Sequence, residues 1–454
     1  MEVEIIYKDC IKPSSPTPPH LKMYNISLLD QFTAFVYVPM ILYYSNPDND
    51  LIPSKKTLIL KRSLSQTLTQ FYPLAGQITD DLSVECNDEG VLYLEARANI
   101  SLSEFLQHPD ITSLHQFLPN KSLLHSPTSG SYVAMIQETT FACGGFTLGI
   151  NVLHLVMDGC ALASFLRAWG AMAYDESQKK MIPSFHGPSI FPKDRNFPGD
   201  ANMIAIFSNF IRVEKMKAAR FVFDGSAIAN LKEKVTNSGV KNPTRVEVVS
   251  ALLSKSLMLA FESKSDNNNN PLPLAIVHAV NVRRRMLPPF PECSMGNFIC
   301  LADTIISGSS KETQLSSFVC QLKEAIAEID SSYVKSIQGD DGFIKFYEKI
   351  KKMNSAFTST SICNGVDYVG FTSWCGFCLY EVDFGWGKPI WTSYAESYGN
   401  GEDAFANHVI LMDARTGNNG IEAWVFSDEG TVIMLEKDQE LLKYAYLNPT
   451  PLFN

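Results

Sequence analysis

The feature that most limits the possible folds is a long irregular stretch near the middle of the chain. From about Met181 to Val213 the hydrophobic periodicity is lost, and "IPSFHGPSIFPKDRNFPGD" contains four prolines. A loop of this length is either functional or a connection between domains. The segments on both sides mix patterns typical of strands with patterns typical of helices. We therefore predict an α/β protein with two mixed-sheet domains, residues 1–180 and 216–454, joined by a long crossover loop, residues 181–215.

The N-terminal half carries the patterns of a helix and of paired strands. "SKKTLILKRSLSQTLTQFYP" has the spacing of an amphipathic helix and ends at Pro73. "LSVECNDEGVLYLEARA" has the composition of two strands, and the turn residues around Asp88 and Gly90 predict a hairpin between them. "SYVAMIQETTF" and "FTLGINVLHLV" flank Gly144 and are rich in strand-forming residues, so we expect them to pair.

The C-terminal half alternates strand and helix patterns. "ARFVFDGSAIANLKEKV" predicts a strand followed by a helix, with Asp224 or Ser226 as the helix cap. Further helices are expected for "TRVEVVSALLSKSLMLAFESK", "QLSSFVCQLKEAIAEI" and "FIKFYEKIKKMNSAF". Strands are expected for "LAIVHAVNVRRRM", "LYEVDFGWGKPIWTSY", "HVILMDA" and "GIEAWVFSD".

Charge and composition argue against several classes of function. The net charge is −10 and the largest basic cluster is the three arginines 283–285, so we expect no nucleic-acid partner. No apolar run reaches the roughly 18–20 residues of a membrane helix, so we expect no membrane partner. The N-terminal "MEVEIIYKDC" has no apolar run of signal-peptide length, and the ten cysteines are widely spread. We therefore expect a cytoplasmic protein with free thiols.

His154 is the first candidate for chemistry. It interrupts an apolar run at the point where the strand pattern "FTLGINVLH" ends and the helix pattern "GCALASFLRAWGAMAY" begins at Gly159. The end of a strand is where side chains meet loops and clefts. One interpretation is a core histidine that is hydrogen-bonded to a backbone carbonyl. The other is a general base, because imidazole titrates near neutral pH.

The role of Asp158 is also open from the residues alone. It lies where the helix N-cap is expected, so its carboxylate has a structural use in accepting first-turn amides. His154 and Asp158 would share a face if the segment were helical, but the strand–turn–helix pattern is against this. No second His, Asp or Glu lies at ligand spacing around His154, so we expect no metal site.

A Cys-x-x-Cys motif at Cys375 and Cys378 is preceded by Trp374, as in thiol–disulfide oxidoreductases. That chemistry needs a helix after the motif, because the helix N-terminus lowers the pKa of the thiol. Here the following "LYEVDFGWG" has a strand pattern, so we expect no redox role. The sequence contains neither a G-x-S-x-G nucleophile elbow nor a phosphate-binding glycine-rich loop.

Two motifs together resemble the signatures of one enzyme family. "HLVMDG" (154–159) is similar to the H-x-x-x-D-G signature of the BAHD acyl-CoA-dependent acyltransferases, and "DFGWGKP" (383–389) is similar to their second signature. H-x-x-x-D is expected by chance in many chains, but "DFGWG" is rare and follows in the right order. "FYPLAG", "FACGG", "TRVEVV" and "AVNVRRRMLPPFP" also resemble blocks of the family. The likeness covers nearly the whole chain and is greatest to acetyltransferases of plant alkaloid biosynthesis.

This resemblance implies a fold of two chloramphenicol-acetyltransferase-like α/β domains with a channel between them. His154 would lie in the channel and remove the proton from an acceptor hydroxyl or amine, which then attacks the thioester of an acyl-CoA. Neither an acyl-enzyme, a metal nor a tightly bound cofactor would be required. The co-substrate would be an acyl-CoA, most simply acetyl-CoA, and we expect a monomer.

The resemblance also assigns roles to residues away from His154. In the family the motif aspartate pairs with an arginine, and by position these are Asp158 and Arg283. Thr372 and Trp374 are candidate oxyanion donors, and Lys255 is a candidate contact for a coenzyme phosphate. The members of the second motif would be structural: Asp383, Phe384, Gly385, Trp386 and Gly387.

Three positions depart from the family pattern. Many relatives have arginine at the positions of Gln77 and Gly376, and a tryptophan is common at the position of Ser254. These positions affect pocket shape or packing, so they bear on the acceptor and the acyl donor more than on the reaction class.

We predict an acetyl-CoA-dependent O-acetyltransferase acting on a hydroxyl of a bulky metabolite such as an alkaloid or a terpenoid. Transfer from malonyl-CoA or a longer acyl-CoA, and N-acylation, remain open. A thioesterase or ester hydrolase, in which water replaces the acceptor, is another class. A non-catalytic binding protein is a third, and the intact His154 and Asp158 argue against it.

Overall fold

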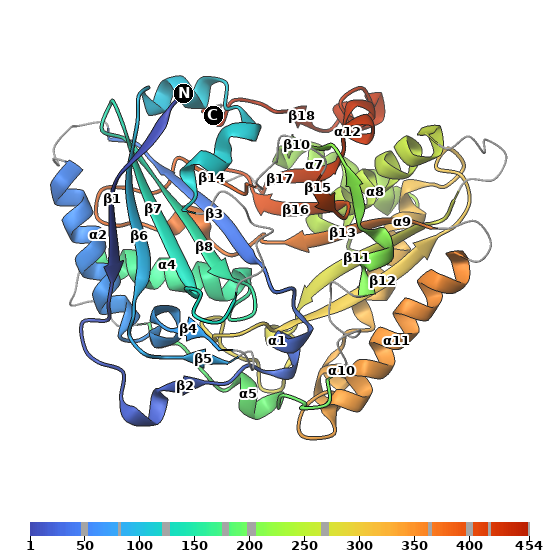
Figure 1. Cartoon of the computed structure of the whole chain (residues 1–454). Helices are drawn as coiled ribbons and strands as arrows, with labels where there is room; N and C mark the ends of the chain where they lie inside the picture. The colour runs from blue at the N-terminus through green and yellow to red at the C-terminus, as the bar shows by residue number, and fades with distance from the viewer. Residues whose placement is uncertain are drawn as a thin grey trace.

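The computed structural model contains two sheets side by side, the first built mainly from the N-terminal half and the second from the C-terminal half (Figure 1). It describes residues 1–46, 53–79, 83–119, 128–174, 181–197, 206–264, 272–361, 366–395, 403–415 and 419–452.

Among the described residues, six strands form the N-terminal sheet in the order β1-β6-β7-β8-β3-β14. Their bounds are Val3–Ile11 (β1), Tyr37–Tyr44 (β3), Val91–Ala98 (β6), Ala134–Phe141 (β7), Phe146–Leu153 (β8) and Trp391–Ser393 (β14). Neighbours are antiparallel except β6 and β7, which are parallel. The predicted pairing of the two strands around Gly144 is confirmed, because they are β7 and β8.

The described part of the C-terminal half forms a sheet of seven strands in the order β12-β11-β13-β16-β17-β10-β18. Their bounds are Met216–Phe223 (β10), Leu274–Asn281 (β11), Ile299–Ile306 (β12), Asp367–Ser373 (β13), His408–Asp413 (β16), Ile421–Asp428 (β17) and Tyr446–Leu447 (β18). β13 lies parallel to both β11 and β16, and the other neighbours are antiparallel. The sheet is therefore mixed, as expected.

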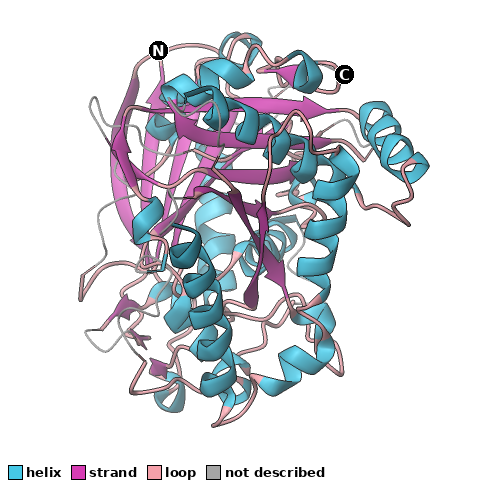
Figure 2. Cartoon of the chain, turned by 90° about the vertical axis from the view of Figure 1, so that its right-hand side faces the viewer, coloured by secondary structure: helices cyan, strands magenta, loops and turns pink. Residues whose placement is uncertain are grey.

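Helices pack along these sheets (Figure 2). They are α1 (Leu28–Phe32), α2 (Pro53–Leu68), α3 (Leu102–Gln107), α4 (Gly159–Tyr174), α5 (Gly187–Ile190), α7 (Gly225–Asn237), α8 (Arg245–Lys264), α9 (Leu315–Ala327), α10 (Ser331–Ser336), α11 (Gly342–Ser361), α12 (Glu429–Leu435) and α13 (Gln439–Leu442). The predicted helices correspond to α2, α4, α7, α8, α9 and α11. Asp224 is the N-cap of α7, since its carboxylate accepts the Ala227 N–H at 2.7 Å.

The C-terminal sheet is buried on both faces, which explains its continuous apolar runs. In β16, Val409 and Leu411 belong to the core that includes residues of α7, α8 and α9. Ile410 and Met412 point the other way and join the core of the N-terminal half. α7, α8 and α9 thus cover one face of the sheet, whereas at β16 the N-terminal half packs against the other face.

The short strand β14 crosses the predicted boundary between the halves. It follows the second motif in sequence but pairs with β3, with Trp391 opposite Tyr43 and Ser393 opposite Ile41. The Tyr43 and Ser393 hydroxyl oxygens lie 2.9 Å apart. The division at residues 180 and 216 stays a prediction, and one segment of the C-terminal half completes the N-terminal sheet.

The predicted crossover loop contains little regular structure where it is described. Residues 198–205 lie outside the described part of the chain. The remainder includes α5 and a strand, β9 (Arg212–Glu214), which pairs with β15 (Asp403–Phe405).

The predicted hairpin between residues 82 and 98 is wrong. β5 (Val84–Glu85) pairs with the short strands β2 (Met23–Tyr24) and β4 (Gln77–Ile78), whereas β6 belongs to the large sheet. The residue expected to make the turn has another use: Asp88 accepts the Thr17 hydroxyl at 2.5 Å and the Lys22 ammonium at 2.7 Å. Asp88 therefore fastens the proline-rich arm, residues 12–20 ("KPSSPTPPH"), and the segment that follows it, instead of closing a hairpin.

The strand predicted for "LYEVDFGWGKPIWTSY" is wrong over most of its length. Leu379–Glu381 is a 3₁₀ turn, and only Trp391–Ser393 is a strand. Gly385 and Gly387 have φ of 101° and 108°, a conformation that interrupts a strand and is open mainly to glycine. The alternating pattern is thus broken by its glycines.

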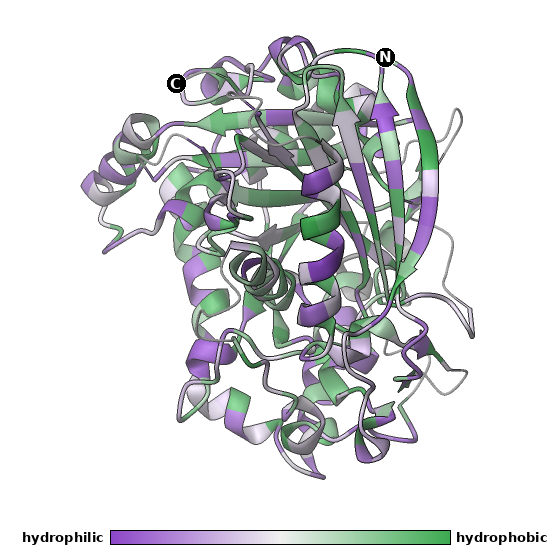
Figure 3. Cartoon of the chain, turned by 90° about the vertical axis from the view of Figure 1, so that its left-hand side faces the viewer, coloured by the Kyte–Doolittle hydropathy of each residue, from purple (hydrophilic) through white to green (hydrophobic). Residues whose placement is uncertain are grey.

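Figure 3 shows β1 at the edge of the N-terminal sheet, with both hydrophobic and hydrophilic residues along it. Ile5 and Tyr7 on this strand are 52% and 53% exposed, as an edge strand allows. In the described segments, every helix is too short or too polar to span a bilayer.

Candidate active site

His154 lies at the turn between β8 and α4, as the sequence pattern predicts. All eight residues of β8 are buried, and the strand ends at Leu153. The His154 N–H donates to the Val36 carbonyl oxygen at 2.8 Å, which anchors the turn beside the start of β3. α4 begins at Gly159 and extends through the core of the N-terminal half.

Asp158 caps α4 and also forms an ion pair with Arg283. Its Oδ1 accepts the Ala161 N–H at 2.9 Å, as an N-cap does. The two guanidinium nitrogens of Arg283 donate to Oδ2 at 2.7 Å and to Oδ1 at 3.0 Å. The Phe298 N–H donates to Oδ2 at 3.0 Å. Both oxygens of the Asp158 carboxylate therefore accept hydrogen bonds from Ala161, Arg283 or Phe298.

This pair is buried and joins the two halves of the chain. The exposed fraction is 3% for the Asp158 side chain and 0% for that of Arg283. Burial opposes the charge of Arg283, but the Asp158 carboxylate holds the pKa of this arginine above its ordinary value. Arg283 also donates to the Ser294 and Gly296 carbonyl oxygens at 3.0 and 3.3 Å. Among the described contacts no hydrogen bond links Asp158 to the His154 ring.

The His154 ring has one buried and one open nitrogen. Nδ1 is buried and has no hydrogen-bond partner among the described residues, whereas Nε2 is not among the buried unpaired atoms. Burial lowers the pKa of His154, opposed by its own carbonyl, the Asp158 carboxylate and the Asn297 side chain. The imidazole is thus held neutral at neutral pH, the state that accepts a proton.

Two residues that sequence reasoning did not single out hold the backbone of His154. The Asn297 side-chain N–H₂ donates to the His154 carbonyl oxygen at 2.7 Å and to Asp30 Oδ1 at 2.8 Å. Asp30 is fully buried and forms a capping box with Ser27 at the start of α1. The S-x-x-D spacing at 27–30 was a readable signal for the cap, but the contact with Asn297 is not local in sequence.

Thr372 and Trp374 lie at the end of β13. Thr372 pairs with Ile410, which faces the N-terminal half. Trp374 approaches the first residue of α4: its indole nitrogen is 3.0 Å from the position that a Cβ on Gly159 would occupy. Both residues therefore lie on a segment close to the His154 turn, and their role as oxyanion donors stays a prediction.

The second motif forms a tight turn that packs against α4. The Asp383 carboxylate accepts the Gly385 N–H at 2.8 Å and the Gly387 N–H at 3.0 Å. The Asp383 carbonyl oxygen is 2.8 Å from where a Cβ on Gly170 would lie. Gly170 is eleven residues beyond the start of α4, roughly 16 Å along its axis.

The aromatic members of the motif complete the core. Phe384 is 1% exposed and packs edge-on against Tyr44 and Trp169, with ring centroids 5.7 and 5.0 Å apart. Trp386 packs against Phe146 at 5.9 Å. This geometry is that of a packing element, although the structural role assigned to residues 383–387 stays a prediction.

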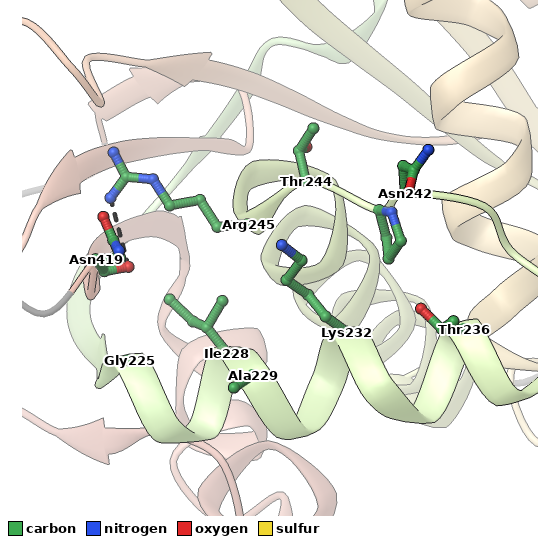
Figure 4. A pocket seen from close by; sticks show the side chains of 10 residues that line it. Gly225, Ile228, Ala229, Lys232, Thr236, Asn242, Thr244, Arg245 and Asn419 are labelled. Carbon is green, nitrogen blue, oxygen red and sulfur yellow. Dashed lines mark hydrogen bonds between the residues drawn. The ribbon is translucent and has the colours of Figure 1, made fainter.

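Lys255 lies on α8, where its ammonium contacts the Glu440 carboxylate at 2.9 Å. A surface cavity of about 750 Å³ between α7 and the start of α8 is lined by two other cations, Lys232 and Arg245 (Figure 4). Arg245 in turn contacts Asp413 at 2.5 Å. Lys255 is not among the residues that line this cavity, and its contact with a coenzyme phosphate stays a prediction.

The Cys-x-x-Cys motif is followed by the 3₁₀ turn Leu379–Glu381 and not by the expected strand, so the absence of a redox role stays a prediction. Cys375 and Cys378 are free thiols. Burial raises the pKa of Cys375 to about 11, which is opposite to the shift that activates a thiol. Within the described residues, no group of three or more His, Cys, Asp or Glu side chains is arranged to hold a metal ion.

Comparison with known proteins identifies the family. A model of the Transferase family matches residues 1–442. The chain is 42% identical to epi-neemfruitin B 7-O-acetyltransferase of Melia azedarach and 39% identical to limonoid 7-O-acetyltransferase of Citrus sinensis, in each case over 100% of both chains. The crystal structure of vinorine synthase superposes with a TM-score of 0.78 at 30% identity, covering 98% of each chain.

These matches confirm the fold of two chloramphenicol-acetyltransferase-like α/β halves and the reaction class. The matched ranges span His154, Asp158, Arg283 and the second motif. The chain therefore belongs to the Transferase family of BAHD acyltransferases and is an acyltransferase that uses acetyl-CoA as its co-substrate.

Proposed function

We propose that this enzyme acetylates a hydroxyl group of a polycyclic terpenoid of the limonoid type, with His154 as the general base. The full-length similarity to two limonoid 7-O-acetyltransferases supports the acceptor class. The observation that carries the mechanism is the His154 ring, whose pKa is lowered by burial while Nε2 stays open.

The proposed reaction is direct transfer. Nε2 of neutral His154 takes the proton of the acceptor hydroxyl. At the same time the hydroxyl oxygen of the acceptor attacks the thioester carbonyl of acetyl-CoA. The new C–O bond forms, the tetrahedral oxyanion collapses, and the C–S bond breaks. The sulfur leaves as a thiolate and takes the proton back from Nε2. No acyl-enzyme is formed, and the proton balance closes within the site.

The remaining site residues have supporting roles in this proposal. In this proposal Thr372 and Trp374 donate to the oxyanion, which needs fixed donors. Asp158 and Arg283 shape the turn that carries His154, and the motif 383–387 supports α4. Lys255 is retained as a candidate for the coenzyme phosphates.

We also propose that the protein acts as a cytoplasmic monomer. The nine described cysteines are free thiols, as expected in a reducing compartment. Light scattering coupled to size exclusion tests the monomer, since a mass near 50.5 kDa is expected for one chain.

The test uses the purified chain with acetyl-CoA and a panel of acceptors. The panel contains limonoid 7-alcohols, limonoid 21-alcohols, alkaloid alcohols and amines, with thiol release and product mass as readouts. Acetylation of a limonoid alcohol with one thiol released per ester supports the proposal. Preferential transfer to an alkaloid or an amine would replace the acceptor class, and faster transfer from malonyl-CoA would replace the donor.

Two further outcomes would overturn the proposed reaction. Thiol release that does not depend on an acceptor indicates a thioesterase. Binding of acetyl-CoA without any turnover across the panel indicates a non-catalytic relative.

A further inference from the structure

We propose that Asp413 is a positioning residue for the transfer reaction, because it fixes the turn at residues 374–377 against the segment that carries His154. The turn belongs to the C-terminal half, and the segment that it contacts, at the start of α4, belongs to the N-terminal half. The inference deepens the proposed function and rests on it for the part that Trp374 plays. It follows from a hydrogen bond on one side of the turn and a close approach on the other.

The turn begins where β13 ends. The Trp374 N–H donates to the Leu411 carbonyl oxygen of β16 at 2.7 Å, directly after the last pair of residues between these two strands. The chain then reverses, since the Phe377 N–H donates to the Trp374 carbonyl oxygen at 3.2 Å. Gly376 lies within this turn with φ of 84°, a conformation that favours glycine. Its N–H finds an acceptor outside the turn.

Asp413, the last residue of β16, supplies that acceptor. Its Oδ2 accepts the Gly376 N–H at 2.7 Å. Its Oδ1 contacts the guanidinium of Arg245, the first residue of α8, at 2.5 Å. The same guanidinium donates to the Gly420 carbonyl oxygen at 3.2 Å. One oxygen of the carboxylate therefore holds the turn, while the other is held in place from α8.

The other side of the turn lies against Gly159, the first residue of α4. Nε1 of Trp374 and Cε2 of Phe377 lie 3.0 and 3.1 Å from the position that a Cβ on Gly159 would occupy. A methyl group at that position would require the two rings to move by a few tenths of an ångström. Asp158, the cap of α4, directly precedes Gly159. The turn thus packs on the end of the segment that begins at His154.

Ring contacts restrain Trp374 but do not set the direction of the turn. Its ring meets Tyr394 edge-on with centroids 5.9 Å apart, and Tyr394 meets Phe426 of β17 in the same way at 5.5 Å. Such contacts allow a range of packing positions, whereas a hydrogen bond needs its N–H to point at the acceptor. The bond from Gly376 to Asp413 therefore orients the backbone between the two rings of the turn.

The consequence is that the position of Trp374 beside the His154 segment depends on Asp413. In the proposed reaction Trp374 donates to the oxyanion, and such a donor is effective when it is fixed before the charge develops. A loosened turn weakens an interaction that is made in the transition state. We therefore expect loss of the Asp413 carboxylate to lower kcat and to leave KM for acetyl-CoA unchanged.

Kinetics of the full chain, followed by thiol release, test this split with a matched control. Asp413→Ala should lower kcat per folded molecule by roughly threefold to tenfold, the effect of one hydrogen bond. Asp413→Asn keeps an acceptor for the Gly376 N–H and should recover most of kcat. The control is Asp367→Ala, because Asp367 begins the same strand, β13, and also pairs with an arginine, Arg212, at 3.3 Å.

Asp367→Ala should keep kcat per folded molecule, since Asp367 lies at the end of β13 remote from the turn. Equal losses of kcat in Asp413→Ala and Asp367→Ala would mean a general effect of breaking an arginine pair and would overturn the assignment. Failure of Asp413→Asn to recover activity would overturn it as well.

A double-mutant cycle tests whether the two sides of the turn act together. Gly159→Ala pushes the Trp374 and Phe377 rings aside while Asp413 holds the turn, so we expect a loss of kcat per folded molecule. In Asp413→Ala the turn can yield, so adding Gly159→Ala should cost less than it does in the wild type. Fully additive losses would contradict the inference.

Hydrogen exchange provides a readout that does not depend on activity. Mass spectrometry of the peptide that contains Gly376 should show faster exchange in Asp413→Ala than in the wild type or in Asp367→Ala. Unchanged exchange in Asp413→Ala would overturn the inference. If that variant does not fold, Asp413→Ser replaces it, because the shorter serine side chain does not reach Gly376, and the same outcomes apply. Faster exchange in a chain whose wild type transfers no acetyl group would support the inference and overturn the proposed function.

Discussion

Two histidines of the described chain, His278 and His154, lie in or directly beside apolar strands, and their surroundings differ. His278 lies within β11, is 4% exposed, and stacks on Phe371 with ring centroids 4.8 Å apart. Its Nε2 is buried without a partner among the described residues, and burial alone lowers the pKa of His278 to about 4. His154 lies just past the end of β8, beside Asn297 and the Asp158–Arg283 pair.

The comparison separates neutrality from reactivity. Burial makes both imidazoles neutral at neutral pH. Only His154 combines a neutral ring with an open nitrogen and polar groups that orient it. We infer that the polar groups around the ring, and not its burial, distinguish a general base from a core histidine.

The largest expected effect comes from removing each ring in turn. His154→Ala should fold and lose ~10²–10⁴-fold in kcat, because a positioned general base is lost. His278→Phe should keep most activity, because the phenyl ring can stack on Phe371. Circular dichroism checks folding, and thiol release with a responsive acceptor checks activity. Comparable losses of activity in the two variants would contradict the distinction between His154 as a base and His278 as a core residue.

The second effect concerns the Asp158–Arg283 ion pair beside His154. Asp158→Asn and Arg283→Gln should each lower the free energy of unfolding by ~3–5 kcal/mol, because each leaves a buried group without its partner. Combined, they should be less than additive. Glu348→Gln is the control, since its pair with Lys345 is exposed and should be worth ~1 kcal/mol or less.

Urea unfolding alongside activity per folded molecule measures this cycle. An Asp158→Asn variant that unfolds like the wild type but turns over a hundredfold more slowly would contradict this account. It would show that Asp158 acts in the reaction and not only in the fold.

The third effect is a pH dependence that belongs to His278. Its pKa is about 4 in the folded chain against 6.5 when unfolded, so below 6.5 the unfolded chain binds a proton that the folded chain does not. Stability should therefore fall as the pH is lowered from 6.5 to about 4, with roughly 2 kcal/mol lost between about pH 7 and about pH 5. His278→Phe should remove this part of the acid sensitivity. Identical pH profiles of unfolding for the variant and the wild type would show that His278 is not buried neutral.

The smallest effect is expected at the cysteines near Trp374. Cys375→Ser and Cys378→Ser, singly and together, should leave activity within about twofold, because the raised pKa of Cys375 keeps its thiol protonated. Assays with and without reductant check this. Activity that follows the redox state and disappears in the double variant would contradict it.

The sequence predicted the His154 turn because its signals are local. The change from strand to helix periodicity and the capping aspartate both lie within a few residues of His154, as does the cap Asp224 at α7. Local patterns failed where a distant contact decides the structure. Asp88 fastens the proline-rich arm instead of a hairpin, and β14 pairs with β3 from the other half.

The sequence predicted only part of the hydrogen-bond network around His154. The pairing of Asp158 with Arg283 was expected from family resemblance, and spacing alone did not give it. Asp30 and Asn297 are separated by 267 positions, and no local pattern joins them. Similarly, no residue near Lys255 in sequence predicts that its ammonium pairs with the Glu440 carboxylate.

The most direct test of the central claim is the pH dependence of kcat/KM per folded molecule, measured in His278→Phe so that acid unfolding through His278 is removed. If neutral His154 accepts the proton, activity should be level through neutral pH. It should fall on acidification with an inflection below 6.5, because burial lowers the pKa of His154 from that value. An inflection above 6.5, or activity that persists at low pH while the protein stays folded, would contradict the account.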